Sequence, residues 1–249
     1  MVILKTANAI KKMREAGRLS ALALKVGGEA VRPGVTTAEI DKAIHDFIVS
    51  QGATPSFLNL YGFPASACIS VNDELIHGIP GNRVIKEGDI VSIDVGACLD
   101  GYHGDNAATF VAGEASEEAQ KLLDVTKQSL YKGIEAAIVG NRVGDISNAV
   151  QTYCEERGYS VVREFVGHGI GRDVHEDPEV PNFGAAGHGP CLVNGMCIAI
   201  EPMINAGTRF VSTDSNGWTV RTKDGKLSAH FEHTIAITED GPIILTDPD

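Results

Sequence analysis

The sequence GDIVSIDVGACLDGYHGDNAATFV, residues 88–111, places two acids, Asp94 and Asp105, in a pattern that otherwise indicates two strands. On both sides of the dipeptide Asp100-Gly101 the chain carries short runs of apolar and β-branched residues. An Asp-Gly pair between such runs favours the type I′ turn that connects two antiparallel strands. The stretch therefore predicts a β-hairpin that carries two carboxylates.

The register of this hairpin brings the two acids together. With the Asp-Gly pair in the turn, Asp94 lies opposite Ala107 and Asp105 lies opposite Gly96. The acids are then diagonal neighbours on one face, with Cα atoms roughly 7–8 Å apart. Two buried carboxylates at this separation repel each other, so one stays protonated unless a cation lies between them. The hairpin alone also permits the interpretation that one acid is simply solvated at a strand end.

Length and composition permit one large globular domain or two small ones. The chain has 249 residues, of which 43% are hydrophobic, and this suffices for a substantial core. No apolar run approaches the ~20 residues that cross a bilayer, and the first residues lack the apolar core of a signal peptide. The five cysteines form no C-x-x-C pair, which favours reduced thiols over disulfides or a thiolate zinc site. We therefore expect a cytoplasmic protein with no membrane contact.

The charge of the chain argues against one class of ligand. A formal net charge of −12 disfavours binding to nucleic acid. It suits an acidic cleft that captures a positively charged group.

Helical patterns precede the hairpin and recur in the second half of the chain. Thr6 is a predicted N-cap of a long first helix, and Thr36 and Glu39 form a capping box for a second. Ser116 starts a third helix, and residues 143–157 form a fourth. Each half of the chain thus supplies two helices before a stretch that contains an acid.

The two halves have related sequences. A shift of 106 residues lays the apolar stripe and the terminal glycine of the second helix on those of the fourth. A shift of 107 lays Asp94 on Glu201, so the second half should carry a related hairpin with Glu232 at the place of Asp105. This predicts an α+β fold of two helix-helix-hairpin halves, related by a pseudo-twofold axis around a central antiparallel sheet. The halves cover about residues 1–113 and 114–249 of one domain, residues 1–249.

Two such hairpins would bring Asp94, Asp105, Glu201 and Glu232 together. That much negative charge cannot be buried without cations, so the pattern predicts a site for two divalent ions ~3.5–4 Å apart. Oxygen ligands with one imidazole favour Mn²⁺, Fe²⁺, Co²⁺ or Zn²⁺. His168, in the glycine-rich sequence GHGIG, is the candidate imidazole, although a lone histidine in such a loop is more often structural.

Five short motifs each contain one of these candidate ligands. They are SIDVG with Asp94, HGDNAATF with Asp105, GHGIG with His168, AIEPM with Glu201 and FEHTIAIT with Glu232. Together these motifs resemble the type I methionine aminopeptidases in their short bacterial form, over essentially the whole chain. The resemblance implies the duplicated pita-bread fold, two metal ions, and removal of the initiator methionine from nascent proteins when the second residue is small. It also implies that these five residues ligate the metals, with Asp105 and Glu232 bridging both ions.

The resemblance also implies catalytic roles for three residues. Glu201 would be a general base as well as a metal ligand, and His77 and His175 would contact the substrate amide and stabilise the oxyanion. Considered without the resemblance, each of these two histidines could instead cap backbone groups in a loop. His45 is expected on a solvent-facing helix surface. Structural roles are expected for His103, His188, His230 and His233.

An apolar pocket for the methionine side chain is expected beside the metal site. The resemblance implies that Cys68 lines this pocket, and no base is arranged in the sequence for it to act as a nucleophile. Val174 departs from familiar relatives, which carry an aromatic residue before His175, and the apolar loop has Phe and Leu where relatives often have Cys and Tyr. The predicted substrate-binding residues are Phe57, Leu60, Phe63, Cys68, His77, His175 and Trp218.

Two other functions remain open at this point. An Xaa-Pro aminopeptidase of the same fold would share the five ligands but usually carries an added N-terminal domain. A pita-bread binding protein without metals would show gaps in the ligand set, and none is present. The expected partners of the methionine enzyme are the N-terminal methionine of nascent polypeptides and, transiently, the ribosome, with the enzyme as a monomer.

Overall fold

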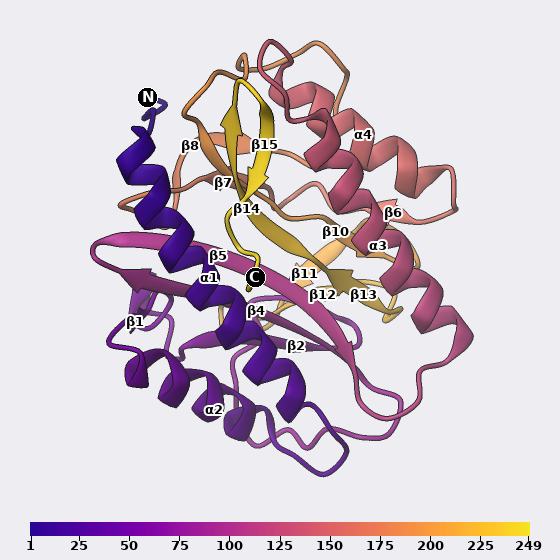
Figure 1. The fold of residues 1–249 in the computed structure, drawn as a ribbon. Coiled ribbons are helices and arrows are strands. Elements are labelled where there is room, and N and C mark those ends of the chain that lie inside the picture. The colour runs from indigo at the N-terminus through magenta and orange to yellow at the C-terminus, as the bar shows by residue number, and fades with distance from the viewer.

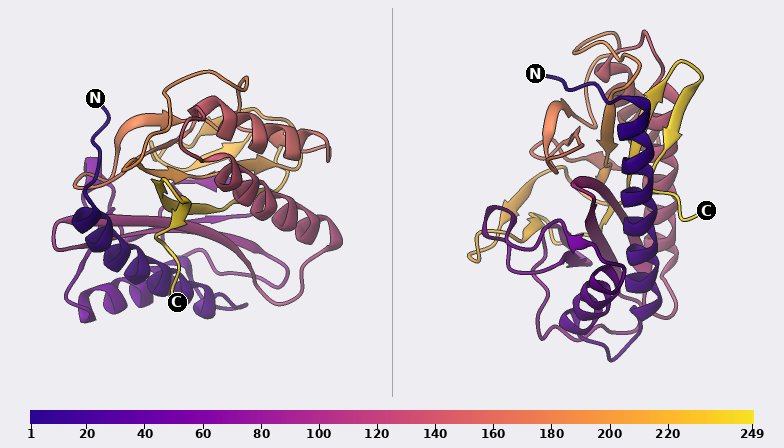
Figure 2. Two further views of the ribbon diagram at one scale, coloured as in Figure 1. Left: turned by 45° about the horizontal axis from the view of Figure 1, so that its top comes forward. Right: turned by 60° about the vertical axis from the view of Figure 1, so that its left-hand side comes forward.

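The computed structural model describes residues 1–249 and has the predicted α+β architecture, in which helices cover one side of a curved antiparallel sheet (Figure 1). The right-hand view of Figure 2 shows α1 and α3 on this same side of the sheet. None of the helices combines the length and apolar character needed to cross a membrane. The helices are α1 (Ala7–Ala30), α2 (Thr37–Ser50), α3 (Glu117–Ala136) and α4 (Val143–Glu155), with a short 3₁₀ turn at Leu60–Gly62.

The strands form one large sheet and two small ones. The large sheet has nine strands in the order β1-β4-β5-β14-β9-β7-β8, with β2 paired to β4 and β15 paired to β14. The small sheets have the orders β13-β10-β6 and β11-β12-β3. The strands are β1 (Thr54–Pro55), β2 (Ala67–Val71), β3 (Glu74–Ile76), β4 (Ile90–Leu99), β5 (Tyr102–Val111), β6 (Ser160–Val161), β7 (Gly167–Gly169), β8 (Glu176–Val180), β9 (Cys197–Ile200), β10 (Met203–Asn205), β11 (Val211–Thr213), β12 (Val220–Thr222), β13 (Ser228–His230), β14 (Glu232–Thr238) and β15 (Gly241–Ile244).

The first hairpin has the predicted register. Asp94 on β4 lies opposite Ala107, and Asp105 on β5 lies opposite Gly96. The turn residues Asp100 and Gly101 have φ values of 52° and 73°, as a type I′ turn requires. The two strands are longer than the apolar runs indicate, because the ladder continues through polar residues up to the turn.

The second half contains the related pair of strands, but with a long insertion. β9 pairs antiparallel with β14, with Ile200 opposite His233, so Glu201 and Glu232 lie at the end of this ladder. The return segment, residues 228–238, is split at Phe231, because its first part, β13, pairs with β10 in a small sheet. The insertion contains β12, which pairs with β11 and also with β3 of the first half.

The helix starts agree with the sequence signals. The Thr6 hydroxyl accepts a hydrogen bond from the backbone N–H of Ala9 at 3.2 Å, and the Ser116 hydroxyl does the same for Ala119 at 3.1 Å. Thr36 and Glu39 form the complete capping box. Side-chain caps of this kind satisfy N–H groups that have no partner within the helix.

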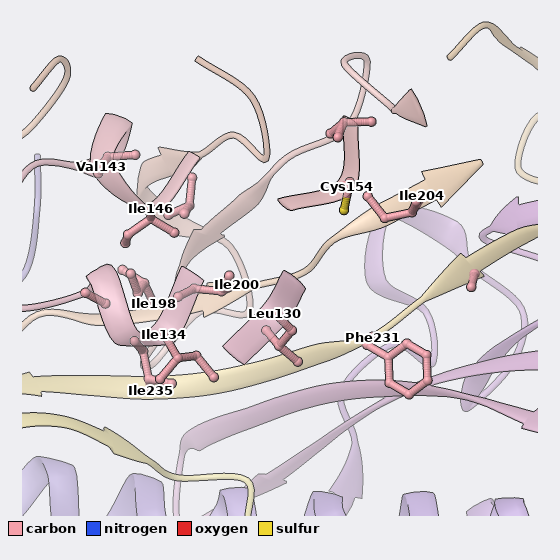
Figure 3. Close-up of a cluster of buried hydrophobic side chains, with 14 of the residues drawn as sticks. Leu130, Ile134, Val143, Ile146, Cys154, Ile198, Ile200, Ile204, Phe231 and Ile235 are labelled. Carbon is pink, nitrogen blue, oxygen red and sulfur yellow. The ribbon is translucent and has the colours of Figure 1, made fainter. Parts of the chain in front are cut away.

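Each half has its own apolar core beneath its helices. The core of the second half joins α3 and α4 to β9 and β14, through Leu130, Ile146, Ile198 and Ile235 (Figure 3). That of the first half joins α1 and α2 to β2 and β4 through residues such as Ile40, Ile44, Ile69 and Ile93. These cores fix the strands that carry the acids.

Helix α1 touches the sheet backbone directly beside Asp105. A Cβ atom on Gly104 would lie 2.4 Å from the Cα atom of Gly17, and a Cβ atom on Gly17 would lie 2.4 Å from the carbonyl oxygen of Leu245. Any larger side chain at either glycine would force the helix and the strands apart. The two glycines therefore permit a close approach of helix and sheet at the position of the acid.

Candidate metal centre and substrate pocket

The four predicted acids and His168 line one cavity of about 730 Å³. They come from adjacent strands, because β5 is paired to β14, with Ala107 opposite Glu232. This junction between the halves also fixes the backbone of Asp105. The Thr234 hydroxyl donates to the Asp105 carbonyl oxygen at 2.8 Å and accepts from its N–H at 3.1 Å.

The donor set fits a divalent cation. Three carboxylate oxygens, one each from Asp94, Asp105 and Glu232, are buried without a hydrogen-bond partner. The ligand atoms of Asp105, His168 and Glu232 all lie within 4.8 Å of one another. Burying a carboxylate oxygen that accepts no hydrogen bond costs free energy unless a cation or a proton neutralises the carboxylate.

His168 presents one ring nitrogen to the acids. Its Nε2 lies 3.6 Å from Glu201 Oε1 and 3.8 Å from Asp105 Oδ2. Its Nδ1 lies 2.9 Å from the carbonyl oxygen of Gly169, which accepts the Nδ1–H hydrogen bond. This bond fixes the tautomer in which Nε2 has a free lone pair, as in many metal sites.

Burial dominates the electrostatics of the centre. It raises the pKa of Asp105 to about 7, and it raises the pKa values of Asp94, Glu201 and Glu232 well above their ordinary range. Repulsion between the acids adds to the upward shifts of these last three. Burial also lowers the pKa of His168 to about 4, so its imidazole is neutral at neutral pH. The centre therefore takes up protons or a cation in preference to bare negative charge.

We predict that the metal-free protein, prepared with a chelator, loses stability as the pH rises. Above pH ~7 the buried histidines are largely neutral in both states, because their folded pKa values are lowered and the unfolded pKa is about 6.5. The carboxyl pKa values are raised in the folded state, so in this range the folded protein binds more protons than the unfolded protein. Stability should therefore fall from pH 7 to pH 8.5, as the folded carboxyl groups lose their protons, by on the order of a few kcal/mol. Denaturant unfolding at pH 7 and pH 8.5 measures the change.

Two controls accompany this measurement. Adding Mn²⁺ at pH 8.5 should restore most of the lost stability, because an ion that binds only the folded state stabilises it by mass action. Asp105→Asn, which cannot ionise, should weaken the pH dependence of the metal-free protein. Metal-free protein that becomes more stable from pH 7 to pH 8.5 would contradict the prediction.

His77 and His175 approach the centre from two different loops. His77 follows β3 in a left-handed conformation, with φ of 56°, and its ring meets the edges of Phe165 at 5.7 Å and Trp218 at 6.3 Å between centroids. Such a strained backbone in a cavity is often associated with function. The His175 ring packs edge to face on the ring of His168, with centroids 4.5 Å apart. Burial lowers the pKa of His77 to about 4 and also lowers that of His175, so both are neutral donors at neutral pH.

The predicted methionine pocket is an apolar slot next to the acids. Phe57, Phe63, Cys68 and Val174 belong to one buried cluster, and Leu60 and Trp218 pack against it. Cys68 on β2 lies opposite Asp94 on β4, so the slot opens beside this acid. Burial raises the pKa of the Cys68 thiol well above its usual value, which keeps it protonated and poorly nucleophilic.

Comparisons with known proteins agree with this geometry. The model of metallopeptidase family M24 matches residues 11–239. The chain belongs to the M24 metallopeptidase family. It is 59% identical over 246 residues to a methionine aminopeptidase of Clostridium perfringens, with 99% of each chain covered. The crystal structure of methionine aminopeptidase from Rickettsia prowazekii superposes with a TM-score of 0.98 at 44% identity, covering 99% of this chain and 100% of that one.

A wider likeness extends to prolidases. This M24 metallopeptidase matches the prolidase from Pyrococcus furiosus with a TM-score of 0.80 at 24% identity. The match covers 99% of this chain and 66% of the prolidase. At this identity the likeness shows a shared fold alone.

Sequence reasoning missed two residues at the centre of this metallopeptidase. His230, expected to be structural, has its Nε2 3.7 Å from Glu201 Oε2 and without a hydrogen-bond partner. Side chains alternate between the two faces of an extended segment, so residue 230 lies on the same face as Glu232. This pattern could have identified His230 as a residue of the site. Tyr61 stacks on His175 with ring centroids 5.8 Å apart, although its own side chain is largely exposed.

Of three other histidines, one departs from its expected place and two have the structural contacts expected of them. His45 is half-buried, not fully solvent-facing, because its Nδ1 lies 2.8 Å from the Ser66 hydroxyl. His103 and His233 have structural contacts, with hydroxyl groups 2.8 Å and 2.9 Å from their Nδ1 atoms.

Proposed function

We propose that this metallopeptidase removes the N-terminal methionine from nascent proteins and peptides whose second residue is small. The observation that carries the proposal is the buried apolar slot around Cys68, which adjoins a cluster of buried carboxylates and His168. An unbranched, polarisable thioether fits an irregular apolar slot of this kind. Methionine aminopeptidases similar over the full length of the chain support the same function.

Two divalent ions, Mn²⁺, Fe²⁺, Co²⁺ or Zn²⁺, form the proposed cofactor. When bound, such ions polarise a carbonyl group and acidify a water molecule at neutral pH. The unpartnered buried oxygens of the acids and the free Nε2 of His168 support this assignment. The proposed ligands are Asp94, Asp105, His168, Glu201 and Glu232.

The side chains around the centre have complementary roles in this proposal. The raised pKa of Glu201 suits a group that takes a proton from water and returns it to the leaving amine. The neutral imidazoles of His77 and His175 donate hydrogen bonds to the substrate amide and to the oxyanion that develops from its carbonyl group. Asp94, beside the slot, faces the free α-amine of the substrate. The remaining proposed substrate contacts are Phe57, Leu60, Phe63, Cys68 and Trp218.

The same enzyme would act on nascent chains as one domain, residues 1–249, and as a monomer in the cytoplasm. Transient contact with the ribosome would bring it to its substrate. Its net charge of −12 argues against direct binding to nucleic acid. Halves at about residues 1–113 and 114–249 would each contribute acids to the shared centre.

A panel of five peptides tests the proposed function with Mn²⁺ or Co²⁺ present. Met-Ala-Ser should be cleaved. The rate of cleavage of Leu-Ala-Ser should be roughly 10–200-fold lower, because a pocket distinguishes similar apolar side chains by about 1–3 kcal/mol. Met-Leu and Met-Lys peptides should be poor substrates because their second residue is large. N-acetyl-Met-Ala should not be cleaved, since it lacks the amine that faces Asp94.

Xaa-Pro peptides serve as the control for the prolyl alternative. Faster release of a non-methionine residue from an Xaa-Pro peptide than of methionine from Met-Ala-Ser would replace the methionine function with that alternative. Absence of cleavage of every peptide, at full metal loading, would favour a binding protein.

A further inference from the structure

A buried ion pair ties the N-terminal segment to the loop that carries His175. The Lys5 ammonium contacts the Glu176 carboxylate, and their side chains are only 5% and 6% exposed. By contrast, the side chains of the helix pair Lys42 and Asp46 are 73% and 58% exposed. Lys5 and Glu176 lie 171 positions apart in the chain, and Glu176 directly follows His175.

The Glu176 carboxylate holds the loop in a tight turn. Its Oε1 accepts hydrogen bonds from the backbone N–H of Arg172 at 2.9 Å and of Asp173 at 3.4 Å. A further backbone bond runs from the N–H of Gly171 to the carbonyl oxygen of Asp173 at 3.0 Å. The side chain of Glu176 thus closes the turn from which His175 extends onto His168.

Lys5 is itself fixed on both sides. Its backbone N–H donates to the carbonyl oxygen of Gly195 at 2.7 Å, and its ammonium also donates to the carbonyl oxygen of Ile3 at 3.1 Å. A Cβ atom on Gly171 would lie 2.4 Å from Lys5 Cε and 2.6 Å from Glu176 Oε1. The lysine, the carboxylate and the turn therefore pack closely against one another.

We propose that Lys5 is a positioning residue for His175, acting through Glu176. This role rests on the proposed function, in which His175 contacts the substrate amide. A buried ion pair contributes little net stability but leaves an uncompensated charge when one partner is removed. Without the ammonium, the buried Glu176 carboxylate has no counter-charge, and its hold on the turn weakens. His175 then moves relative to His168, and misplacement by about 1 Å can lower a rate by ~10²-fold.

Lys5→Met in the metal-loaded full-length enzyme tests the proposal. We expect kcat for Met-Ala-Ser to fall about 10–100-fold, with KM and metal content within about twofold of the wild type, because the substrate amide is contacted most strongly in the transition state. Lys5→Arg should restore most of the lost kcat, since it keeps the charge. Lys42→Met, which breaks only the exposed pair, is the matched control and should leave kcat unchanged.

A double-mutant cycle separates positioning from a general structural effect. In a His175→Ala background, Lys5→Met should cause no further fall in kcat, because the group that it positions is already absent. An equal further fall, or an unchanged kcat in Lys5→Met alone, would overturn the proposal. If Lys5→Met does not fold, Lys5→Met with Glu176→Gln, which leaves no buried charge, takes its place in the cycle with the same expected coupling.

The wild-type enzyme distinguishes this inference from the function on which it rests. If the wild type releases no methionine, the proposed function fails and the positioning role fails with it. If the wild type releases methionine and the cycle is fully additive, only the role of Lys5 is wrong.

Discussion

Asp105→Ala and Glu232→Ala are each expected to lower cleavage of Met-Ala-Ser by about 10³-fold or more and to abolish binding of two metal ions. Both side chains are buried on adjacent strands with an unpartnered oxygen, and their ligand atoms share a cluster with His168. A metal contributes several kcal/mol to transition-state stabilisation, and each ~1.4 kcal/mol is a tenfold change in rate. Peptide assays and calorimetric metal titration measure the two losses.

Glu239→Ala is the matched control for these two variants. Glu239 follows the end of β14 and is exposed, so its removal takes away one acid of the same segment but none of the cluster. Its activity and metal stoichiometry should equal those of the wild type. Normal stoichiometry in Asp105→Ala or Glu232→Ala would mean that the assigned ligand set is wrong.

His77→Ala and His175→Ala are each expected to lower kcat by about 10²-fold. Removal of one hydrogen-bond donor to a developing oxyanion typically has an effect of this size. Metal affinity should be nearly unchanged, because neither histidine belongs to the cluster of Asp105, His168 and Glu232. Steady-state kinetics on Met-Ala-Ser and metal titration of the same preparations separate the two effects.

The control for this pair is His188→Ala, at an exposed histidine outside the substrate cavity. It should retain full activity. A large loss of metal from His77→Ala would indicate that this histidine is a ligand and not a donor to the substrate.

The first hairpin could be predicted in detail because local chemistry determines it. The Asp100-Gly101 turn and the alternation of side chains fix the register, and the register fixes which residues face Asp94. The starts of the helices also follow from local signals, as at Thr36. The placement of the acids in one cavity follows from the duplication together with these local elements.

Features that depend on tertiary packing could not be predicted. The segment around Phe231 reads as one continuous strand, and only its partners, β10 and β14, divide it in two. Tyr61 reaches His175 through a left-handed backbone conformation, with φ of 51°, that its sequence does not signal. The contact between Lys5 and Glu176 joins segments too far apart for any local pattern to indicate it.

The close approach of Gly17 and Gly104 links helix α1 to the proposed metal centre. A single added carbon at either position meets backbone atoms, which cannot rotate away as a side chain can. Because Gly104 precedes Asp105, such a change would displace a proposed metal ligand from the rear of the sheet without altering any residue that lines the cavity. With the proposed ligand set, metal affinity would therefore depend on helix α1 as well as on the ligands.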